Sequence, residues 1–465
     1  MNTSCLGVIG LGTMGANLAR NAARNGARVI LYNRTGEKTD AFMEQYGKEG
    51  EFVACKTLKE FCSAFKGTKV ILLMVKAGDA VDQMIEELIP LLSKGDILID
   101  AGNSHDIDTM VRERNLQKNG IFFLGMGVSG GEEGALKGPS MMPGGSKEAY
   151  EKVAPLLMKM AADDGNGGKC VTYIGPEGTG HFVKMVHNGI EYGIMQLIAE
   201  AYHLLKVEAT LDNADMGKIF EQWNTGYLES FLLEITAKIF HKKDPESGED
   251  LLDLIKDAAG QKGTGKWTTL AAMNYGVAVP TITAAVDARI VSSAKDFRLK
   301  MSNETVLARD NGVSYDKALL IEMIRDALEL SVLNAYAQGF QLLSNASDDG
   351  KWNLNLSEIA RIWRGGCIIR SNVLEAYQRC FAGDEASREQ LRVRFSEHRQ
   401  LHWRRIVALG ALHATALPAM SASLSYYDAY RSAWLPQNLT QAQRDLFGAH
   451  TYERLDRPGS FHTEW

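Results

Sequence analysis

The first third of the chain alternates short apolar runs with helical stretches, and no other feature restricts its fold as strongly. Strands that alternate with helices form right-handed βαβ units, which build a mostly parallel sheet. The apolar runs of strand length occupy residues 5–10, 28–33, 69–75, 96–102 and 121–127. After a loop at 162–169, residues 170–175 are predicted to form one more strand. The sequence therefore predicts an α/β domain over residues 1–178.

The pattern changes at about residue 179. Residues 180–206 read as one long, mostly apolar helix, and most segments from there to about residue 434 also have helical spacing. Residues 435–465 are polar and aromatic, which is typical of a tail that packs on another surface. We therefore expect a large all-α domain over 179–434, followed by a C-terminal tail over 435–465. A length of 465 residues fits two or more domains.

The composition, 45% hydrophobic and 23% charged, is typical of a soluble globular protein. A net charge of −6 argues against a general nucleic-acid binder. The six cysteines form no CxxC pair and the ten histidines no HExxH spacing, so we expect a reduced, cytoplasmic protein without a metal. We expect no signal peptide and no membrane partner, because the sequence shows neither a basic and apolar leader nor an apolar run of spanning length.

The sequence GLGTMG follows the first apolar run and opens a helix, with Gly10, Gly12 and Gly15 at fixed spacing. In such a motif the first glycine allows a tight turn, and the second lets the backbone approach a pyrophosphate. The third permits close packing of helix on strand. The alternative is a glycine-rich turn without a ligand. The strand–turn–helix context favours a Rossmann-type dinucleotide-binding site.

The end of the second strand distinguishes the two nicotinamide cofactors. NAD-binding proteins usually carry an acidic residue there for the ribose hydroxyls, whereas this chain has Asn33, Arg34 and Thr35, with Lys38 a turn later. An acid would repel a 2′-phosphate, and Arg34 offers it a planar fork of donors. The sequence therefore predicts NADP. The alternative is an ordinary exposed arginine at a strand end.

Four polar side chains interrupt the long helix: Lys184, His187, Asn188 and Glu191. Each helical residue advances by about 100°, so their spacings of three, four and seven place them in one stripe. Apolar residues cover nearly all other directions of this helix. Because a buried charge is costly unless it is paired or used, this pattern favours a functional site over a solvated face.

Two glycine-rich and two basic segments add further candidates. DAGNSH (100–105) ends a strand, where ligands of such sheets bind, and residues 125–145 contain eight glycines whose amides can bind an anion. Farther on, the chain carries Lys262, Thr264 and Arg289. By themselves these three could equally be scattered surface residues.

Taken together, these motifs resemble those of the 6-phosphogluconate dehydrogenase family, a branch of the β-hydroxyacid dehydrogenases. The resemblance spans essentially the whole chain and rests on GLGTMG, YNRT, VKAG (75–78), GNS (102–104), VSGGEEGALKGPSMMPGG, VKMVHNGIEYG, KGTGKW and QRDLFGAHTYE. Members oxidise and decarboxylate 6-phosphogluconate to ribulose 5-phosphate and CO₂ with NADP, in the pentose phosphate pathway. The resemblance implies this reaction for the present chain. We expect the reaction to need no metal ion, because the sequence shows no metal-ligand spacing.

The family's binding roles can be carried over to matching positions. For NADP the resemblance implies Gly10, Leu11, Gly12, Thr13, Met14, Gly15, Asn33, Arg34, Thr35, Val75, Lys76, Ala77 and Asn103. For 6-phosphogluconate it implies Asn103, Ser129, Gly130, Gly131, His187, Asn188, Tyr192, Lys262, Thr264 and Arg289. It also implies a homodimer in which the C-terminal tail reaches the other subunit, where Arg444 and His450 complete the substrate site.

The polar stripe suits this chemistry. The resemblance implies that Lys184 takes the proton of the 3-hydroxyl as the hydride leaves, which requires a neutral lysine and a pKa lowered from about 10.4. The charged lysine can then hydrogen-bond the new carbonyl while CO₂ is lost, and Glu191 would protonate the enediol. About 10 Å along the helix axis separates the two residues, so both can serve neighbouring carbons of one sugar acid.

Two other functions fit part of the pattern. A shorter β-hydroxyacid dehydrogenase acting on a smaller 3-hydroxy acid would share the GLGxMG start, the SGG loop and the lysine. It would lack KGTGKW and QRDLFGAHTYE, which this chain has. A non-catalytic protein on a dehydrogenase scaffold would tolerate loss of Lys184 or Glu191, and both are present. The sequence therefore favours the decarboxylating enzyme.

Overall fold

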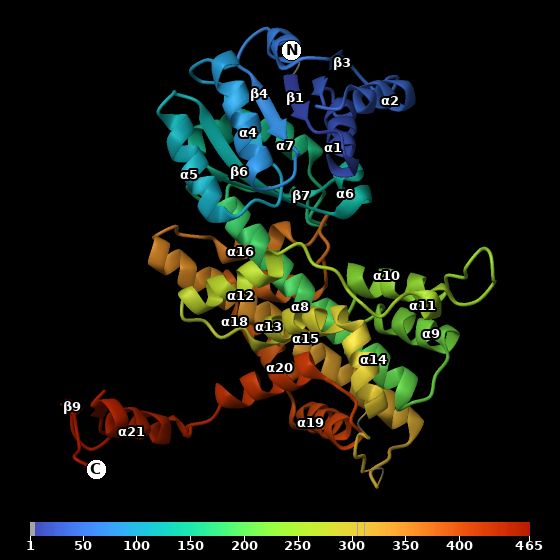
Figure 1. The fold of residues 1–465 in the computed structure, drawn as a ribbon, viewed down its shortest axis with the longest axis vertical. Helices are drawn as coiled ribbons and strands as arrows, with labels where there is room; N and C mark the ends of the chain where they lie inside the picture. The colour runs from blue at the N-terminus through green and yellow to red at the C-terminus, as the bar shows by residue number, and fades with distance from the viewer. Residues whose placement is uncertain (1–4, 305, 311) are drawn as a thin grey trace.

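The computed structural model describes residues 5–304, 306–310 and 312–465. Its N-terminal part holds a seven-stranded sheet in the order β3-β2-β1-β4-β5-β6-β7 (Figure 1). Neighbouring strands run parallel except β6 and β7, so the expected, mostly parallel sheet is confirmed. The strands are β1 (Cys5–Ile9), β2 (Arg28–Tyr32), β3 (Phe52–Cys55), β4 (Val70–Leu73), β5 (Ile97–Asp100), β6 (Phe122–Ser129) and β7 (Ser140–Gly145).

The strands differ from the predicted ones at three places. β3 was not predicted, and β7 lies in the glycine-rich stretch whose amides we expected to face an anion. Residues 170–175 were expected to form a strand and do not, since only Val171 forms a bridge, to Met141 of β7. The segment meets β7 through scattered hydrogen bonds, such as Met141 N–H to the Cys170 carbonyl at 2.9 Å, rather than in a regular ladder.

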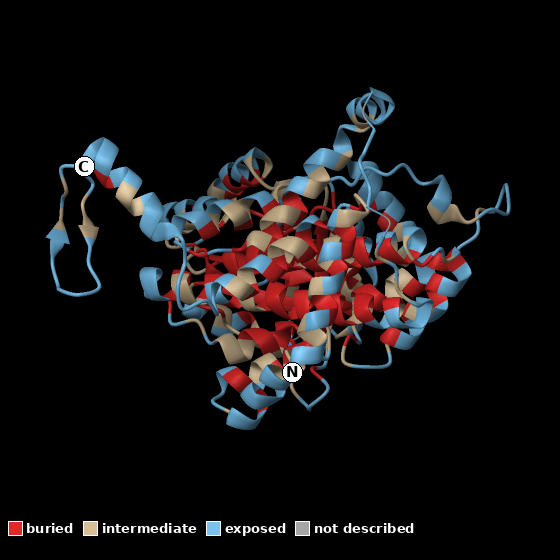
Figure 2. Ribbon diagram, turned by 90° about the horizontal axis from the view of Figure 1, so that it is seen from below, coloured by how far each residue is buried: buried red, intermediate tan, exposed pale blue. Residues whose placement is uncertain are grey.

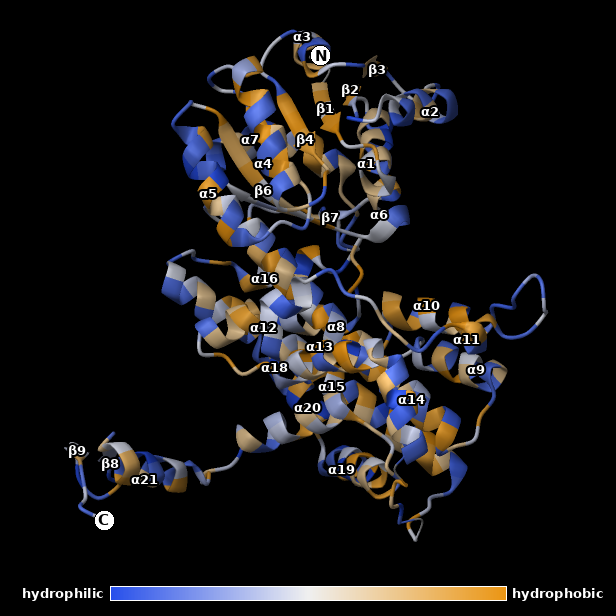
Figure 3. Cartoon of the chain, viewed as in Figure 1, coloured by the Kyte–Doolittle hydropathy of each residue, from blue (hydrophilic) through white to orange (hydrophobic). Residues whose placement is uncertain are grey.

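Helices cover both faces of this sheet because successive strand side chains point to opposite faces. Val8 and Ile9 of β1, for example, are buried in two separate hydrophobic clusters. Figure 3 shows the apolar character of β1 and β4. The helices of this domain are α1 (Thr13–Arg24), α2 (Gly36–Tyr46), α3 (Leu58–Ser63), α4 (Asp79–Leu88) with the short η1 (Ile89–Leu91), α5 (Asp106–Gln117), α6 (Gly131–Lys137) and α7 (Lys147–Met160).

Glycines in the last two strands let the long helix α8 (Thr179–Val207) lie directly on the sheet. A Cβ added to Gly127 of β6 would lie 2.3 Å from Cβ of Lys184, and one on Gly144 of β7 would lie 2.3 Å from the Gly180 nitrogen. Any larger residue at these positions would push α8 away. The glycine spacing of β6 and β7 therefore fixes where the polar stripe of α8 begins.

The rest of the main body is helical, as expected. α8 packs along α15 (Lys317–Gly350), and buried residues of both belong to one hydrophobic core, seen as the red interior of Figure 2. The other helices are α9 (Asn213–Trp223), α10 (Phe231–Phe240), α11 (Leu251–Leu254), α12 (Thr264–Asn274), α13 (Pro280–Ser293), α14 (Lys295–Glu304), α16 (Leu356–Ile362), α17 (Val373–Phe381), α18 (Glu385–Arg394), α19 (Glu397–Leu412) and α20 (Pro418–Ala429). Within the described residues, none of the helices combines the length and hydropathy needed to cross a bilayer.

The C-terminal segment extends away from the helical body as a separate arm (Figure 1). It contains a helix, α21 (Gln437–Gly448), and a small hairpin of β8 (Tyr452–Glu453) and β9 (Ser460–Phe461). Asp445 organises the arm: it accepts hydrogen bonds from Thr451 N–H at 2.9 Å, His462 Nδ1 at 2.9 Å, Thr463 N–H at 3.0 Å and Trp465 Nε1 at 3.0 Å. The arm therefore has a structure of its own.

Candidate active site

Two adjoining cavities open where the sheet meets the helical domain. The sheet cavity, of about 660 Å³, lies at the carboxyl ends of β1, β4 and β5. The stripe cavity, of about 710 Å³, lies over the polar stripe of α8. Met14, Asn103, Val128 and Lys262 line both cavities. Ligands that occupy the two cavities would therefore lie next to each other.

The sheet cavity occupies the position at which open α/β sheets bind ligands. β1 has β2 on one side and β4 on the other, so the strand order reverses there. The cavity wall contains Met14 from the start of α1, Val75, Lys76 and Ala77 after β4, and Asn103 after β5. The structure thus brings together predicted nucleotide residues from three separate segments.

Each of the three glycines of GLGTMG is required, or leaves space, for a different geometric reason. Gly10 has φ +97°, and a Cβ there would lie 2.4 Å from the Met74 carbonyl oxygen. A Cβ on Gly15 would lie 1.9 Å from the Gly10 carbonyl oxygen, so this position requires close helix–strand packing. A Cβ on Gly12 would meet nothing within 4 Å, which leaves open space at the start of α1. This is the arrangement that a pyrophosphate needs.

Four helices begin beside the cavities without a side-chain cap. The N-caps of α1, α4, α6 and α12 are Gly12, Gly78, Gly130 and Gly263, and a glycine has no side chain to bond the first amides. By contrast, Thr57 and Ser146 cap α3 and α7 with side-chain oxygens. Uncapped amides at a helix N-terminus favour anions. The backbone amides at these helix starts can therefore bind anions in the cavities in addition to the charged side chains.

The end of β2 is tied to the glycine turn. Leu11 N–H donates to Asn33 Oδ1 at 2.9 Å, and Asn33 Nδ2 donates to the Thr35 carbonyl at 2.9 Å. Arg34 lies between these two anchored residues with an exposed side chain. Asn33 thus positions the turn, while the side chain of Arg34 points to solvent, where it can reach a ligand.

The stripe of α8 is a buried site rather than a solvated face. Lys184 is 6% exposed and His187 0%. Around Lys184, Asn188, Glu191 and Tyr192, the cavity wall contains Asn103, Ser129, Gly130, Gly131, Lys262, Thr264 and Arg289. Each of the predicted substrate residues outside the tail lines this cavity, apart from His187, which lies behind it.

His187 connects the two ionisable ends of the stripe. Its Nδ1 lies 3.2 Å from Lys184 Nζ and 3.7 Å from Glu191 Oε2. Burial lowers the pKa of Lys184, against the opposing effect of Glu191. Burial raises the pKa of Glu191, although Lys184 and Arg289 act in the other direction. Burial and the nearby Lys184 lower the pKa of His187 well below its usual value. The stripe therefore favours a neutral lysine, a neutral imidazole and a protonated carboxyl.

Cys367, which sequence reasoning missed, contacts the back of His187. Its Sγ lies 2.8 Å from His187 Nε2, and Ser129 Oγ lies 3.1 Å from the same nitrogen. Burial raises the pKa of the Cys367 thiol to about 11, so it stays a donor. Two hydroxyl or thiol donors at Nε2 favour the tautomer with the proton on Nδ1. That proton can be donated to Asn188 Oδ1, which lies 3.1 Å from Nδ1, and Nδ1 is then no acceptor for a charged Lys184 at 3.2 Å.

The basic side of the stripe cavity is held by specific contacts. The Arg289 guanidinium lies 3.5 Å over the Tyr192 ring and donates to the Gly260 carbonyl at 3.0 Å. Asn188 Nδ2 donates to Thr264 Oγ1 at 3.2 Å. Lys262 is exposed at the mouth of the cavity. These contacts orient the donors of α8, α12 and α13 toward one space.

Arg444 and His450 do not join this site within the chain. Both are exposed on the arm, and neither lines the sheet cavity or the stripe cavity. Arg444 donates to Gln441 of its own helix at 3.0 Å. Figure 1 shows the arm pointing away from the junction of the two domains.

Comparison with known proteins agrees with this geometry along the whole chain. Residues 5–175 match the family model described as the NAD binding domain of 6-phosphogluconate dehydrogenase, and residues 180–465 match the C-terminal domain of the same enzyme. The chain is 52% identical to a decarboxylating 6-phosphogluconate dehydrogenase of Synechococcus elongatus, over 99% of this chain and 98% of the relative. It is 49% identical to an NADP(+)-dependent, decarboxylating enzyme of Bacillus subtilis, over the full length of both.

A solved structure agrees as well. Plasmodium falciparum 6-phosphogluconate dehydrogenase, studied in its apo form and in complexes with NADP+ and with 6-phosphogluconate, superposes with a TM-score of 0.92. The two chains are 42% identical, and the match covers 99% of this chain and 100% of that one. With the cavities and both matched domains in place, the chain belongs to the 6-phosphogluconate dehydrogenase family.

Proposed function

We propose that the protein oxidises and decarboxylates 6-phosphogluconate to ribulose 5-phosphate and CO₂ while NADP⁺ is reduced to NADPH. The observation that carries this proposal is the pairing of Lys184 and Glu191 in one cavity that adjoins a dinucleotide cradle. A shorter relative acting on a smaller acid is disfavoured, because the family match extends through residue 465.

NADP suits the sheet cavity, where it would supply the hydride acceptor. The open backbone at Gly12 and the uncapped start of α1 fit a pyrophosphate. Val75, Lys76, Ala77 and Asn103 would hold the cofactor from the β4 and β5 ends. Leu11, Thr13, Met14 and Gly15 would complete the turn. Arg34, with Asn33 and Thr35 beside it, would bind the 2′-phosphate.

The proton steps belong to the stripe. A neutral Lys184 takes the proton of the 3-hydroxyl as C3 is oxidised to a carbonyl. The same amine, now charged, donates to that carbonyl, and the electron pair of the breaking C1–C2 bond moves into an enediol as CO₂ leaves. Glu191, whose protonated form is favoured by burial, delivers a proton to the enediol carbon. These proton transfers take place in a buried site, where charges interact more strongly than in water.

The remaining stripe-cavity residues would hold the sugar acid. Ser129, Gly130, Gly131, Asn103, His187 and Asn188 surround Lys184 and would bind the carboxylate and hydroxyls. Tyr192, Lys262, Thr264 and Arg289 lie toward Glu191 and would bind the phosphate, helped by the uncapped amides of α12.

We further propose a homodimer in which the arm of one subunit completes the site of the other. A phosphate next to a carboxylate calls for more positive charge than Lys262 and Arg289 provide, and Arg444 and His450 are exposed on an arm that does not reach its own site. Apolar arm side chains, among them Phe447 at 70% and Leu439 at 64% exposure, also need a surface to cover them. On this proposal residues 1–178 bind NADP, 179–434 bind substrate and dimerise, and 435–465 cross to the partner. A cytoplasmic location stays a prediction.

The direct test is a spectroscopic assay after exhaustive chelation. Protein, NADP⁺ and 6-phosphogluconate are mixed, and the near-UV absorbance of reduced nicotinamide is followed together with CO₂ release. We expect one CO₂ for each nicotinamide reduced, a strong preference over NAD⁺, and no loss of rate after chelation. Reduction with a smaller 3-hydroxy acid alone would support the shorter-relative function. Activity that returns only with Mg²⁺ or Mn²⁺ would refute the metal-free mechanism.

A further inference from the structure

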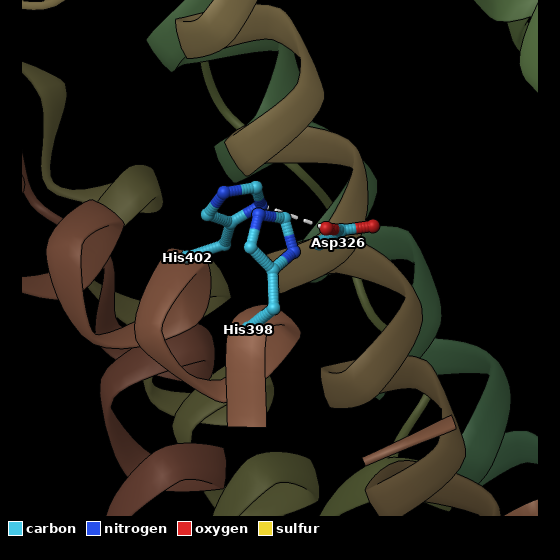
Figure 4. A group of neighbouring side chains, drawn as sticks. All are labelled: Asp326, His398 and His402. Atoms are coloured by element: carbon cyan, nitrogen blue, oxygen red, sulfur yellow. Dashed lines mark hydrogen bonds and ion pairs between the residues drawn. The ribbon is translucent and has the colours of Figure 1, made fainter. Parts of the chain in front are cut away.

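Three side chains that neither cavity uses lie together in the helical domain: Asp326 of α15 and His398 and His402 of α19 (Figure 4). One ligand atom of each lies within 4.8 Å of the others. This corrects the expectation that the chain has no metal-ligand cluster. The missed signal was the H-x₃-H spacing of 398 and 402, and only the packing of α15 on α19 adds the carboxylate.

The geometry is that of a two-helix metal site. Histidines at i and i+4 share one face of a helix, as in helical zinc motifs. The two rings lie with their centroids 4.0 Å apart. His402 Nδ1 lies 2.8 Å from Asp326 Oδ2, so a metal ion bound to both atoms would replace the proton they now share. His398 is exposed and can rotate toward the ion without disturbing the core.

The surroundings prepare the carboxylate. Arg399 Nε donates to the other oxygen, Asp326 Oδ1, at 3.1 Å, which fixes the carboxylate plane and leaves Oδ2 for a metal. Ligating carboxylates in metal sites usually have such a second hydrogen bond. Arg399 is itself paired with Glu329 at 2.7 Å, which Arg394 also contacts, and Arg325 lies 3.3 Å from Asp326 Oδ1 and 3.6 Å from Glu322. The three arginines and the three carboxylates around the cluster therefore balance in charge before an ion binds.

An ion can also reach the site. A cavity of about 700 Å³ opens beside Asp326 and Arg399, between α9, α15 and α18. His398 is exposed to solvent. His402 and Asp326 are 1% and 2% exposed, so two of three ligands are already fixed by packing. An ion can therefore meet the exposed His398 first and then bind the two ligands that packing holds in place.

We propose that Asp326, His398 and His402 form a binding site for a divalent transition-metal ion that prefers imidazole ligands, such as Zn²⁺. Two neutral imidazoles and a carboxylate supply three ligands, and water takes the fourth position. The ion would clamp α19 to α15. It would add stability and take no part in the reaction, because none of the three ligands lines either active-site cavity.

The test is a zinc titration of the full-length protein after chelation and dialysis, in competition with a zinc-sensitive dye. We expect one Zn²⁺ per chain, a higher melting temperature with zinc, and a Co²⁺ complex with the intense visible absorption of tetrahedral coordination. His398→Gln changes only an exposed ligand, and it should weaken zinc binding by about tenfold or more. The thermal shift and the cobalt spectrum should disappear with it.

The matched control is His241→Gln. His241 is another exposed histidine of the helical domain that contacts a carboxylate, Glu221 Oε1 at 3.0 Å, but no third ligand. It should bind zinc as the wild type does. Equal affinity in wild type and His398→Gln would overturn the proposal, as would equal loss in both variants. These readouts do not depend on turnover, so they stand or fall independently of the proposed reaction.

Discussion

At the scale of single residues, the proposed site depends on the amine of Lys184, whose surroundings disfavour its charged form. Lys184 lies on α8 with its neighbours fixed by the glycines of β6 and is almost fully buried. Burial is the largest influence on the pKa of Lys184 and lowers it. Glu191 acts in the opposite direction but does not outweigh burial, and His187, 3.7 Å from Glu191, lies between the two residues. The position therefore lowers stability and would supply the neutral base of the proposed reaction.

Lys184→Met should therefore be inactive and more stable. Turnover should vanish because one group serves both oxidation and decarboxylation. The folded-state pKa lies below the unfolded one, so protonation is penalised in the fold. This cost grows as pH falls from the unfolded pKa toward the folded pKa. We expect a gain of about 1 kcal/mol or more, larger at pH 6 than at pH 10, in denaturant unfolding curves. A variant with near-normal turnover would rule out the assignment.

The rate should depend on pH as a bell. As pH falls through the lowered pKa of Lys184, the amine becomes protonated and cannot accept the 3-hydroxyl proton. As pH rises through the raised pKa of Glu191, the carboxyl loses the proton it must deliver. In Glu191→Gln the alkaline limb of kcat/KM should disappear. The acid limb should stay nearly in place, because on this assignment Glu191 is already protonated and uncharged at the pH at which Lys184 gains its proton. An unchanged bell would exclude Glu191 as the acid.

The sequence could predict the residues of this stripe but not what holds them. Lys184, His187, Asn188 and Glu191 were found because helical spacing places them on one face, which is local information. Cys367 was missed because its contact with His187 spans most of the helical domain. The one local sign was the glycine pair before it, which packs against the loop after β6: a Cβ on Gly130 would lie 2.7 Å from the Gly366 carbonyl oxygen.

Cys367 offers a test of the His187 tautomer. In Cys367→Ala one donor to Nε2 is lost, so the tautomer with a bare Nδ1 gains population and can accept from a charged Lys184. That stabilises the charged amine and raises its pKa. The acid limb of kcat/KM should move up by about half a pH unit, since a hydrogen bond contributes roughly 1 kcal/mol. Cys367→Ser keeps a donor and should resemble the wild type. If both variants leave the limb in place, the thiol does not set the tautomer.

At the scale of elements, the strand–helix alternation and the long amphipathic helix predicted the fold class, whereas some individual strands were predicted wrongly. β7 was missed because its sequence SMMPGG contains the glycines that α8 requires, and glycine and proline are not typical of a strand. Residues 170–175 have the apolar content of a strand but form no regular ladder. In both segments the secondary structure depends on tertiary packing rather than on local sequence. The tail was predicted as a segment, yet its internal order depends on Asp445, whose four partners no spacing rule reveals.

Asp445→Asn should disorder the arm and thereby impair substrate binding. Burial alone would raise the pKa of Asp445, but its hydrogen bonds outweigh this and lower it to about 2, so the carboxylate is charged and accepts on both oxygens. Asparagine would present an NH₂ group to two of the four donors. We expect the KM for 6-phosphogluconate to rise by about tenfold or more, with NADP⁺ affinity unchanged and the arm cleaved faster by protease. Asp456→Asn, which loses only an exposed pair with Arg454, is the control. A loosened arm with unchanged KM would remove the arm from the substrate site.

At the scale of the whole molecule, the proposed function leaves the chain with a full set of cofactor residues and with a substrate site that the arm of a partner would complete. The stripe cavity holds the proposed acid and base with Lys262 and Arg289, while Arg444 is exposed on α21 of the arm. On the proposed arrangement, a second copy of the chain receives this arm. A chain ending near residue 434 should consequently still fold and bind NADP⁺ while losing affinity for 6-phosphogluconate.

Mixed dimers provide the decisive test of this arrangement. Arg444→Ala and Lys184→Met chains are each inactive or nearly so as homodimers, because every site lacks either its arginine or its lysine. In a mixed dimer, one site takes Lys184 from the Arg444→Ala chain and Arg444 from the Lys184→Met chain, so it is intact, and the other site lacks both. The mixed dimer should therefore turn over at about half the wild-type rate, since one of its two sites works. Subunit exchange is verified with different affinity tags on the two variants, and the doubly tagged fraction is assayed. Activity in that fraction alone means that the arm acts in the partner's site; a doubly tagged fraction without activity means that the arm serves its own subunit, and the shared-site proposal is then wrong.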